Sequence, residues 1–198
     1  YATVGGSAKR KEAEGFMNSL KQRKAKNANK FNGALGDVQL QWLKKQLSAA
    51  CVAGQRAVVM IHHPLRPKDE RTNLWNDVDV VPILTSFHCL VAVINGHAHR
   101  HLYDQHHTQH RQVHFVTMGG MVQSPFTSWG FADFYEDELH VHGLVFGRQI
   151  ELHLNISYHS GDPASRGGGS GGDAAPVKEE VKEAVEEVKE EVEEASEK

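Results

Sequence analysis

The spacing of apolar residues predicts a helix and then a buried strand in the first half of the chain. Apolar side chains recur three or four residues apart over 37–54, so we expect an amphipathic helix with Asp37 as its N-cap and Gly54 at its end. The stretch RAVVMIHH, 56–63, follows and stops at Pro64. Its continuous apolar run is typical of a strand buried on both faces.

A second buried strand, CLVAVIN at 89–95, follows a helix expected over about 78–87, with Pro82 tolerated in its first turn. Strand, helix and strand in this order predict a parallel pair joined by a right-handed crossover. The pattern then changes to short, partly alternating stretches that predict hairpins of a mixed or antiparallel sheet. These stretches are 112–118, 129–135, 138–145 and 149–156.

Composition divides the chain into four regions. Residues 1–30 are basic and predict a surface helix and loop; nucleic-acid binding is not expected of them, because no aromatic residues are interleaved. Residues 31–158 form the α/β unit, and 159–176 form a linker rich in glycine and serine. Residues 177–198 carry a valine stripe among Glu and Lys, which fits either a partner-binding helix or an acidic, solvating tail.

The totals describe one ordinary domain with appended material. The chain has 198 residues, of which 39% are hydrophobic and 24% charged. Its net charge of −3 combines −7 from residue 173 onward with +4 before it. No apolar run reaches the roughly 20 residues that span a bilayer, so we expect no membrane partner.

The two cysteines, Cys51 and Cys89, lie in apolar stretches with no second thiol close in sequence. This pattern favours free core thiols in a reducing, cytoplasmic compartment, with a disulfide as the less favoured alternative.

Histidines provide the candidate chemistry. Most of the fourteen are expected to be surface residues, among them His106, His107, His110, His114, His140, His142 and His153. The histidine pairs at the ends of the two buried strands are better candidates than these surface histidines. Parallel strands place their carboxyl ends at one edge of a sheet, so the two pairs come close together. His62 and His63 end one strand; His97 and His99 follow the other, and Gly96 permits a tight exit. We therefore expect a metal site at this edge.

No Asp or Glu stands at either strand end, although a metal site for phosphate chemistry normally includes carboxylates. The chain begins at Tyr1, and its first elements look like the middle of a domain. We therefore expect the remaining ligands, and the catalytic residues with them, upstream of Tyr1.

The motifs IHHP and NGHAHRH resemble blocks of the calcineurin-like metallophosphoesterases. With KFNGALGDVQLQWLKKQL, NLWN and SWGFADFYEDELHVHG, they resemble in particular the manganese-dependent ADP-ribose/CDP-alcohol diphosphatases, over roughly 31–148. The resemblance implies the C-terminal half of an αββα sandwich with mixed sheets. It also implies two divalent ions, Mn²⁺ first, with Mg, Fe or Zn as alternatives.

Carried over by position, His62 and His97 resemble ligands of one metal ion, and His99 resembles a ligand of the other. His63 stands at the position between ligand and proline and is expected only beside the ions. The family's earlier blocks, with the bridging Asp and the Asn ligand, have no match in this sequence. The resemblance thus implies hydrolysis of a phosphoanhydride in a nucleotide substrate, by a site that is incomplete in this chain and inactive by itself.

Four residues near the two strand ends are candidates for substrate contact: Arg66, Asn73, Trp75 and Arg100. Ordinary packing of the tryptophan and solvation of the cations are the alternatives for them.

Two other functions stay open. One is a different calcineurin-like phosphomonoesterase or phosphodiesterase, and the other is a non-catalytic scaffold that carries the acidic helix.

Overall fold

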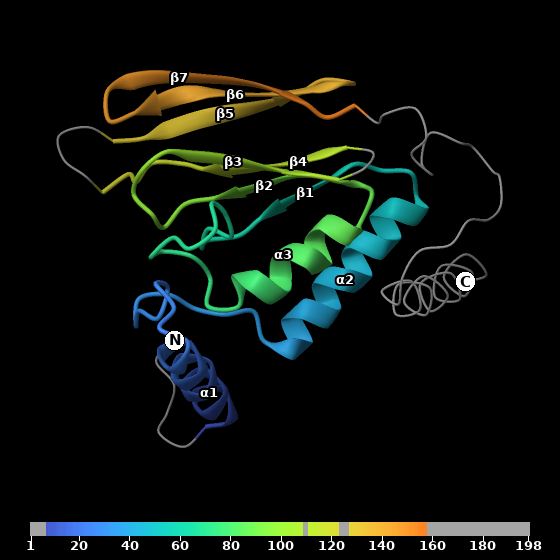
Figure 1. The fold of residues 1–198 in the computed structure, drawn as a ribbon. Helices are drawn as coiled ribbons and strands as arrows, with labels where there is room; N and C mark the ends of the chain where they lie inside the picture. The colour runs from blue at the N-terminus through green and yellow to red at the C-terminus, as the bar shows by residue number, and fades with distance from the viewer. Residues whose placement is uncertain (1–6, 109–110, 123–126, 158–198) are drawn as a thin grey trace.

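The computed structural model describes residues 7–108, 111–122 and 127–157. Three helices and seven strands form a stack of layers (Figure 1). The helices are α1 (Ala8–Gln22), α2 (Asp37–Val52) and α3 (Asp77–Ser86). The strands are β1 (Ala57–Met60), β2 (Leu90–Asn95), β3 (Leu102–His107), β4 (Gln112–Thr117), β5 (Trp129–Phe134), β6 (Glu138–Val145) and β7 (Arg148–Asn155).

The strands form two sheets. The first has the order β1-β2-β4-β3, in which β1, β2 and β4 are parallel and β3 is antiparallel to β4. The second is the antiparallel sheet β5-β6-β7. The predicted parallel pair is confirmed; of the predicted mixed sheets, the first is mixed and the second is purely antiparallel.

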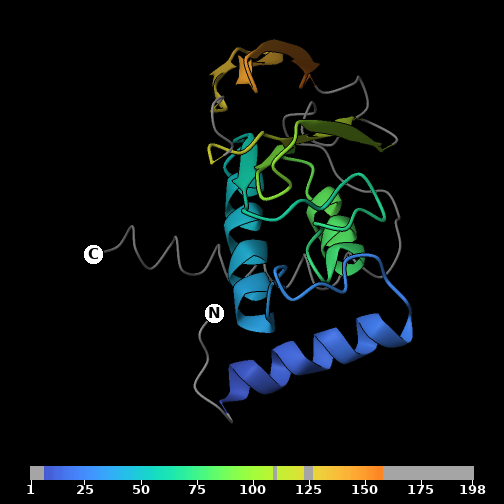
Figure 2. The same ribbon diagram turned by 90° about the vertical axis from the view of Figure 1, so that its left-hand side faces the viewer.

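Two cores hold the layers together. Helices α2 and α3 pack on one face of the first sheet, through side chains that include Leu47, Leu84 and Phe115. The opposite face packs on the second sheet through a core that includes Val116 and Leu139. Helix α1 lies below α2 and α3 in Figure 2, on the side away from both sheets, and Leu20 is its only buried residue. The described residues thus form α, β and β layers; a second helical layer, as in an αββα sandwich, is not among them.

Four sequence-based expectations need correction. Strand β1 is only partly buried, because it lies at the edge of its sheet. Gly36, not Asp37, is the N-cap of α2, and Asp37 lies in the first turn, where the helix dipole favours a negative charge. Pro82 lies in the second turn of α3, where it removes one backbone hydrogen bond. The polar stretch 102–107, which is not among the predicted strands, forms β3.

The described part of the chain holds no helix that is both long and apolar enough to cross a membrane. The predicted linker, 159–176, and the predicted acidic tail, 177–198, lie outside the described residues.

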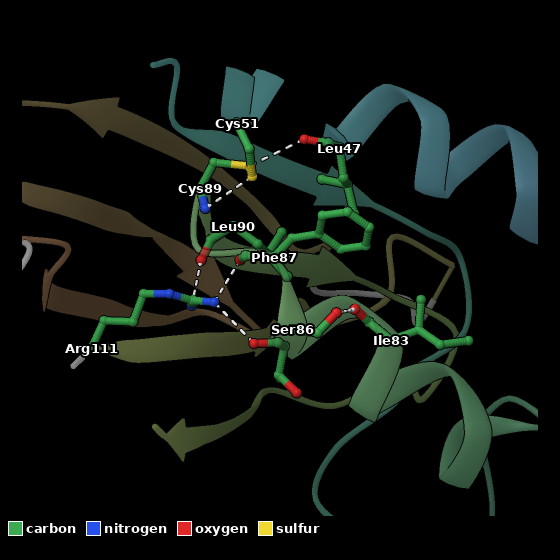
Figure 3. The surroundings of a disulfide bond; sticks show 9 residues. Leu47, Cys51, Ile83, Ser86, Phe87, Cys89, Leu90 and Arg111 are labelled. Atoms are coloured by element: carbon green, nitrogen blue, oxygen red, sulfur yellow. Dashed lines mark hydrogen bonds between the residues drawn. A yellow bond between two sulfur atoms is a disulfide. The ribbon is translucent and has the colours of Figure 1, made fainter. Parts of the chain in front are cut away.

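Cys51 and Cys89 are joined in a disulfide, which corrects the expectation of free thiols (Figure 3). The bond connects the end of α2 to the residue before β2, across a sequence separation of 38 residues. Disulfides persist mainly in oxidising environments, so the cysteines no longer support a reducing compartment.

Arg111 anchors the same region from within the core. Its guanidinium is buried and donates hydrogen bonds to the carbonyls of Thr85, Phe87 and Leu90, at 2.5–3.0 Å (Figure 3). These carbonyls belong to the end of α3 and the start of β2, where no regular ladder satisfies all of them. One buried cation thus fixes the crossover between the strands.

Replacing both cysteines by alanine is expected to lower the free energy of unfolding by about 4 kcal/mol, because a closed loop of this length restricts the unfolded chain by about that amount. Urea denaturation of the oxidised protein and of the double variant measures the difference. Equal midpoints, with unchanged slopes, would contradict a disulfide in the folded protein.

His114 connects the two sheets. Its side chain is 1% exposed on β4, and its Nε2 lies 2.7 Å from the carbonyl oxygen of Asn155 on β7. The carbonyl can only accept, so Nε2 carries the proton, and Nδ1 lies 2.9 Å from the Tyr103 hydroxyl. Burial lowers the pKa of His114 below its usual value.

Because this folded-state pKa lies below the unfolded value near 6.5, the stability that neutral His114 contributes is complete above pH 6.5 and is lost as the pH falls below it. We expect the wild-type free energy of unfolding to decrease between pH 7 and 5. His114→Gln keeps a donor for Asn155 but does not titrate, so its decrease should be shallower. Parallel pH profiles for the two proteins would contradict this role.

Candidate metal centre

The candidate centre lies at the carboxyl ends of β1 and β2. Because these strands are parallel and adjacent, with Met60 opposite Ile94, both release their following residues at the same edge. The pairing continues beyond the strands, where the Gly96 amide donates to the carbonyl oxygen of His62 at 3.1 Å. This bond places His97 beside His62, although 35 residues separate them.

Three imidazoles gather there. His62 Nε2 lies 3.0 Å from His97 Nδ1, and the ring centroids of His63 and His97 are 4.2 Å apart. One ligand nitrogen of each of the three residues lies within 4.8 Å of the others. His62, His63 and His97 are called the histidine cluster below. Imidazoles in this arrangement can hold a transition-metal ion.

Asn32 fixes the orientation of His97. Its Oδ1 lies 3.0 Å from His97 Nε2, and its own amide nitrogen donates to the carbonyls of Asn27 and Arg71, both at 2.9 Å. An amide oxygen only accepts, so His97 is protonated at Nε2 and directs the lone pair of Nδ1 at His62. No local sequence pattern indicates this contact, because Asn32 lies 65 residues from His97.

The turn that carries His97 is strained. His97 and His99 have φ angles of 62° and 53°, in the left-handed region that non-glycine residues seldom adopt. Gly96 was expected to make this exit, but the positive φ angles fall on the two histidines instead. Such strain is held in place by surrounding contacts and is common at functional sites.

His99 lies apart from the cluster. It is exposed and does not belong to the group of three, in which His63 accompanies His62 and His97. Its charge still reaches the cluster, since it contributes to the lowered pKa of His97. The structure therefore brings together His62 and His97 as the sequence predicted, adds His63, and leaves His99 outside the group of three.

Burial and mutual repulsion favour the neutral form of two of these histidines. The pKa of His97 is lowered to about 4, first by burial and then by the charges that His63, His62 and His99 would carry. Burial also lowers the pKa of His63. Neutral imidazole is the form that binds metal ions, so His63 and His97 are in their ligand state at neutral pH.

Two buried polar side chains lie at the same edge. Asn95 and Thr117 end β2 and β4 opposite each other, and they are 5% and 0% exposed. The amide of Asn95 and the hydroxyl of Thr117 have no hydrogen-bond partner within the described structure. An unpaired buried polar group costs about 1–3 kcal/mol of folding free energy. A water molecule or a hydrated metal ion at this edge would supply the missing hydrogen bonds.

The predicted substrate residues have partners of their own. Arg66 pairs with Asp104 at 2.8 Å, and Arg100 pairs with Glu70. Asn73 is fully buried and its amide donates to the Pro67 carbonyl and to Asp77, each at 2.9 Å.

The indole of Trp75 donates to the Asn29 carbonyl at 3.0 Å. The contacts of Asn73 and Trp75 thus hold loops in place without any ligand, and substrate binding by the four residues stays a prediction.

A groove adjoins the cluster. It has a volume of about 470 Å³ and is lined by Lys26, Phe31, Asp69, Glu70, Arg71, Thr72 and Arg100. The Phe31 ring lies 5.8 Å from the His97 ring, and the Arg71 guanidinium lies 5.8 Å from the Phe31 ring. The groove is thus lined by an aromatic ring, three cations and two carboxylates, and Arg100 pairs with Glu70.

The fold resembles that of a dimetal phosphatase. A crystal structure of a dimetal phosphatase from Danio rerio matches with a TM-score of 0.67 and 23% sequence identity, over 78% of this chain and 53% of that one. At this identity the likeness concerns the fold.

The curated proteins that the chain resembles in sequence share one name. A manganese-dependent ADP-ribose/CDP-alcohol diphosphatase of Arabidopsis thaliana is 32% identical over 119 residues, which are 58% of this chain and 37% of that protein. One from Danio rerio is 31% identical over 135 residues, or 65% and 39%. The chain is a distant homologue of these diphosphatases, as its motifs predicted, and spans less than two fifths of the length of either relative. No family model matches the chain.

Asn32→Ala is expected to weaken Mn²⁺ binding by about 10- to 100-fold, because loss of the group that orients a ligating histidine has an effect of that size. Asn29→Ala is the matched control, since this amide also bonds to the Arg71 carbonyl but does not contact His97. Isothermal calorimetry measures both. Equal affinities in the two variants would exclude the orienting role of Asn32.

Proposed function

We propose that the chain supplies part of a dinuclear metal centre that hydrolyses the phosphoanhydride of ADP-ribose or CDP-alcohol type substrates. The observation that carries the proposal is the histidine cluster at the shared edge of β1 and β2, in a distant homologue of manganese-dependent diphosphatases. His62 and His97 hold one ion and His99 the other, with His63 beside them. The neutral state of His97 and its fixed tautomer support this role.

Bound metal ions would polarise the phosphoryl oxygens and lower the pKa of a bound water, so that hydroxide forms at neutral pH. The chain's own residues position and orient the proposed metal ligands. Asn32 holds His97 in the tautomer whose Nδ1 carries a lone pair, and the Gly96 amide keeps His62 in register with it. Arg71, in the adjoining groove, is placed to contact the phosphates of the substrate.

The cluster contains no carboxylate among the described residues. A complete dinuclear centre needs anionic ligands to balance two divalent ions, so they have to come from outside this group. We therefore infer that the chain by itself binds a metal ion at the cluster but does not turn over substrate. Manganese is the expected ion, with Mg, Fe or Zn as alternatives.

Mn²⁺ is expected to bind the purified chain in the micromolar range, and His97→Ala is expected to weaken binding at least about tenfold, because one of the three imidazoles is lost. His107→Ala is the control, since His107 is an exposed histidine on β3, away from the cluster. Calorimetry gives affinity and stoichiometry. Absence of binding in the wild-type chain would favour the scaffold alternative.

Hydrolysis of ADP-ribose, CDP-choline and p-nitrophenyl phosphate, each followed with added Mn²⁺, separates the enzymatic alternatives. We expect no turnover by the chain alone. Turnover of the monoester only would favour a phosphomonoesterase, and turnover of the two nucleotides would show that the chain carries all its ligands.

A further inference from the structure

A second group of metal-binding side chains lies on the outer face of the sheet β5-β6-β7, which no described element covers (Figure 1). Residues alternate between the two faces of each strand, and on β6 Leu139 and Val141 point into the core. Their neighbours Glu138, His140 and His142 therefore share the outer face. The residues opposite them on β7 share that face too, and His153 lies directly opposite His140.

Glu138, His140 and His153 lie close enough to hold one ion. One ligand atom of each lies within 4.8 Å of the others. Glu138 Oε2 is 2.6 Å from His140 Nε2, and the ring centroids of His140 and His153 are 4.0 Å apart. Two ligands bonded to one Zn²⁺ at about 2.0–2.2 Å are separated by at most about 4 Å, so small rotations of these surface side chains complete the site.

Glu151 orients the imidazole of His153 for binding a metal ion. The Nε2 of His153 lies 3.0 Å from Glu151 Oε1, which accepts a hydrogen bond from it. With Nε2 held by Glu151, the Nδ1 lone pair is left for a metal ion. A carboxylate behind a ligating histidine is the usual means of fixing its tautomer and orientation.

Charge on this face favours a cation. The three carboxylates of Asp133, Glu138 and Glu151 accompany the histidines, so the face carries a charge of −3 when the imidazoles are neutral. One divalent ion between His140 and His153, whose rings are 4.0 Å apart, would offset two of these three negative charges.

We propose that Glu138, His140 and His153 form a zinc site that is separate from the histidine cluster. Two imidazoles and one carboxylate, with a position left for water, are a ligand set that suits Zn²⁺. The ion would link β6 to β7 and stabilise the second sheet. The cluster lies instead at the carboxyl edge of the first sheet, on β1 and β2.

The test is calorimetry with Zn²⁺ on the full chain carrying His62→Ala and His97→Ala, so that the cluster does not compete. We expect one ion to bind, and further replacement of His140 or His153 by alanine to weaken binding at least about tenfold. His142→Ala is the matched control, because His142 lies on the same face and strand but pairs with Asp133 at 2.7 Å. It should keep the affinity of the parent.

His140→Gln distinguishes the loss of a zinc ligand from a folding defect, because glutamine can still donate a hydrogen bond to Glu138 but is a poor zinc ligand. Its metal-free melting temperature should match the parent, while the rise in melting temperature on adding Zn²⁺ is lost. Unchanged Zn²⁺ affinity in the His140 and His153 variants, equal weakening in His142→Ala, or no binding in the parent would each overturn the proposal. None of these results depends on the cluster, so the proposed function is tested separately.

Discussion

The parallel pairing of β1 with β2 is the constraint on which the candidate centre depends. The hydrogen bond from the Gly96 amide to the His62 carbonyl extends the ladder past the last residue of each strand and sets the two histidine-bearing turns side by side. A slip of one residue would turn every side chain of β1 to the opposite face and move His62 away from His97. The Arg111 guanidinium and the disulfide protect this register, because both fix the entry into β2.

Buried amides hold the loops around that edge. Asn76 exchanges two hydrogen bonds with the backbone of Leu35, at 3.1 and 2.9 Å, and Asn73 fastens the loop after β1 to the start of α3. Asn32 does the same for the segment before α2 and also contacts His97. Loops have no ladder of their own, so side-chain amides satisfy their backbone groups. The position of the site thus depends on asparagines far from it in sequence.

The sequence predicted the parts of this structure that local pattern determines. The apolar run of β2 and the histidines after it were evident, because burial and strand-end position leave a continuous signal. Strand β3 was missed, since a polar edge strand with alternate residues exposed resembles a loop. The disulfide and the Asn32 contact join residues 38 and 65 positions apart, and only the folded chain brings them together. His63 lies in the group with His62 and His97, although its position between the predicted ligand and Pro64 gave no reason to expect it there.

The second sheet shows how a core can determine surface chemistry. Val141 and Leu154 must point inward to cover the face of the first sheet, and alternation then leaves no choice for their neighbours on β6 and β7. The hairpin register sets His140 opposite His153, a pairing that the sequence of either strand alone does not contain. Each imidazole then has a carboxylate within reach, so the face is neutral or negative depending on the protonation of its histidines. Hydrophobic packing on one side of the sheet has therefore fixed the geometry of ionisable groups on the other.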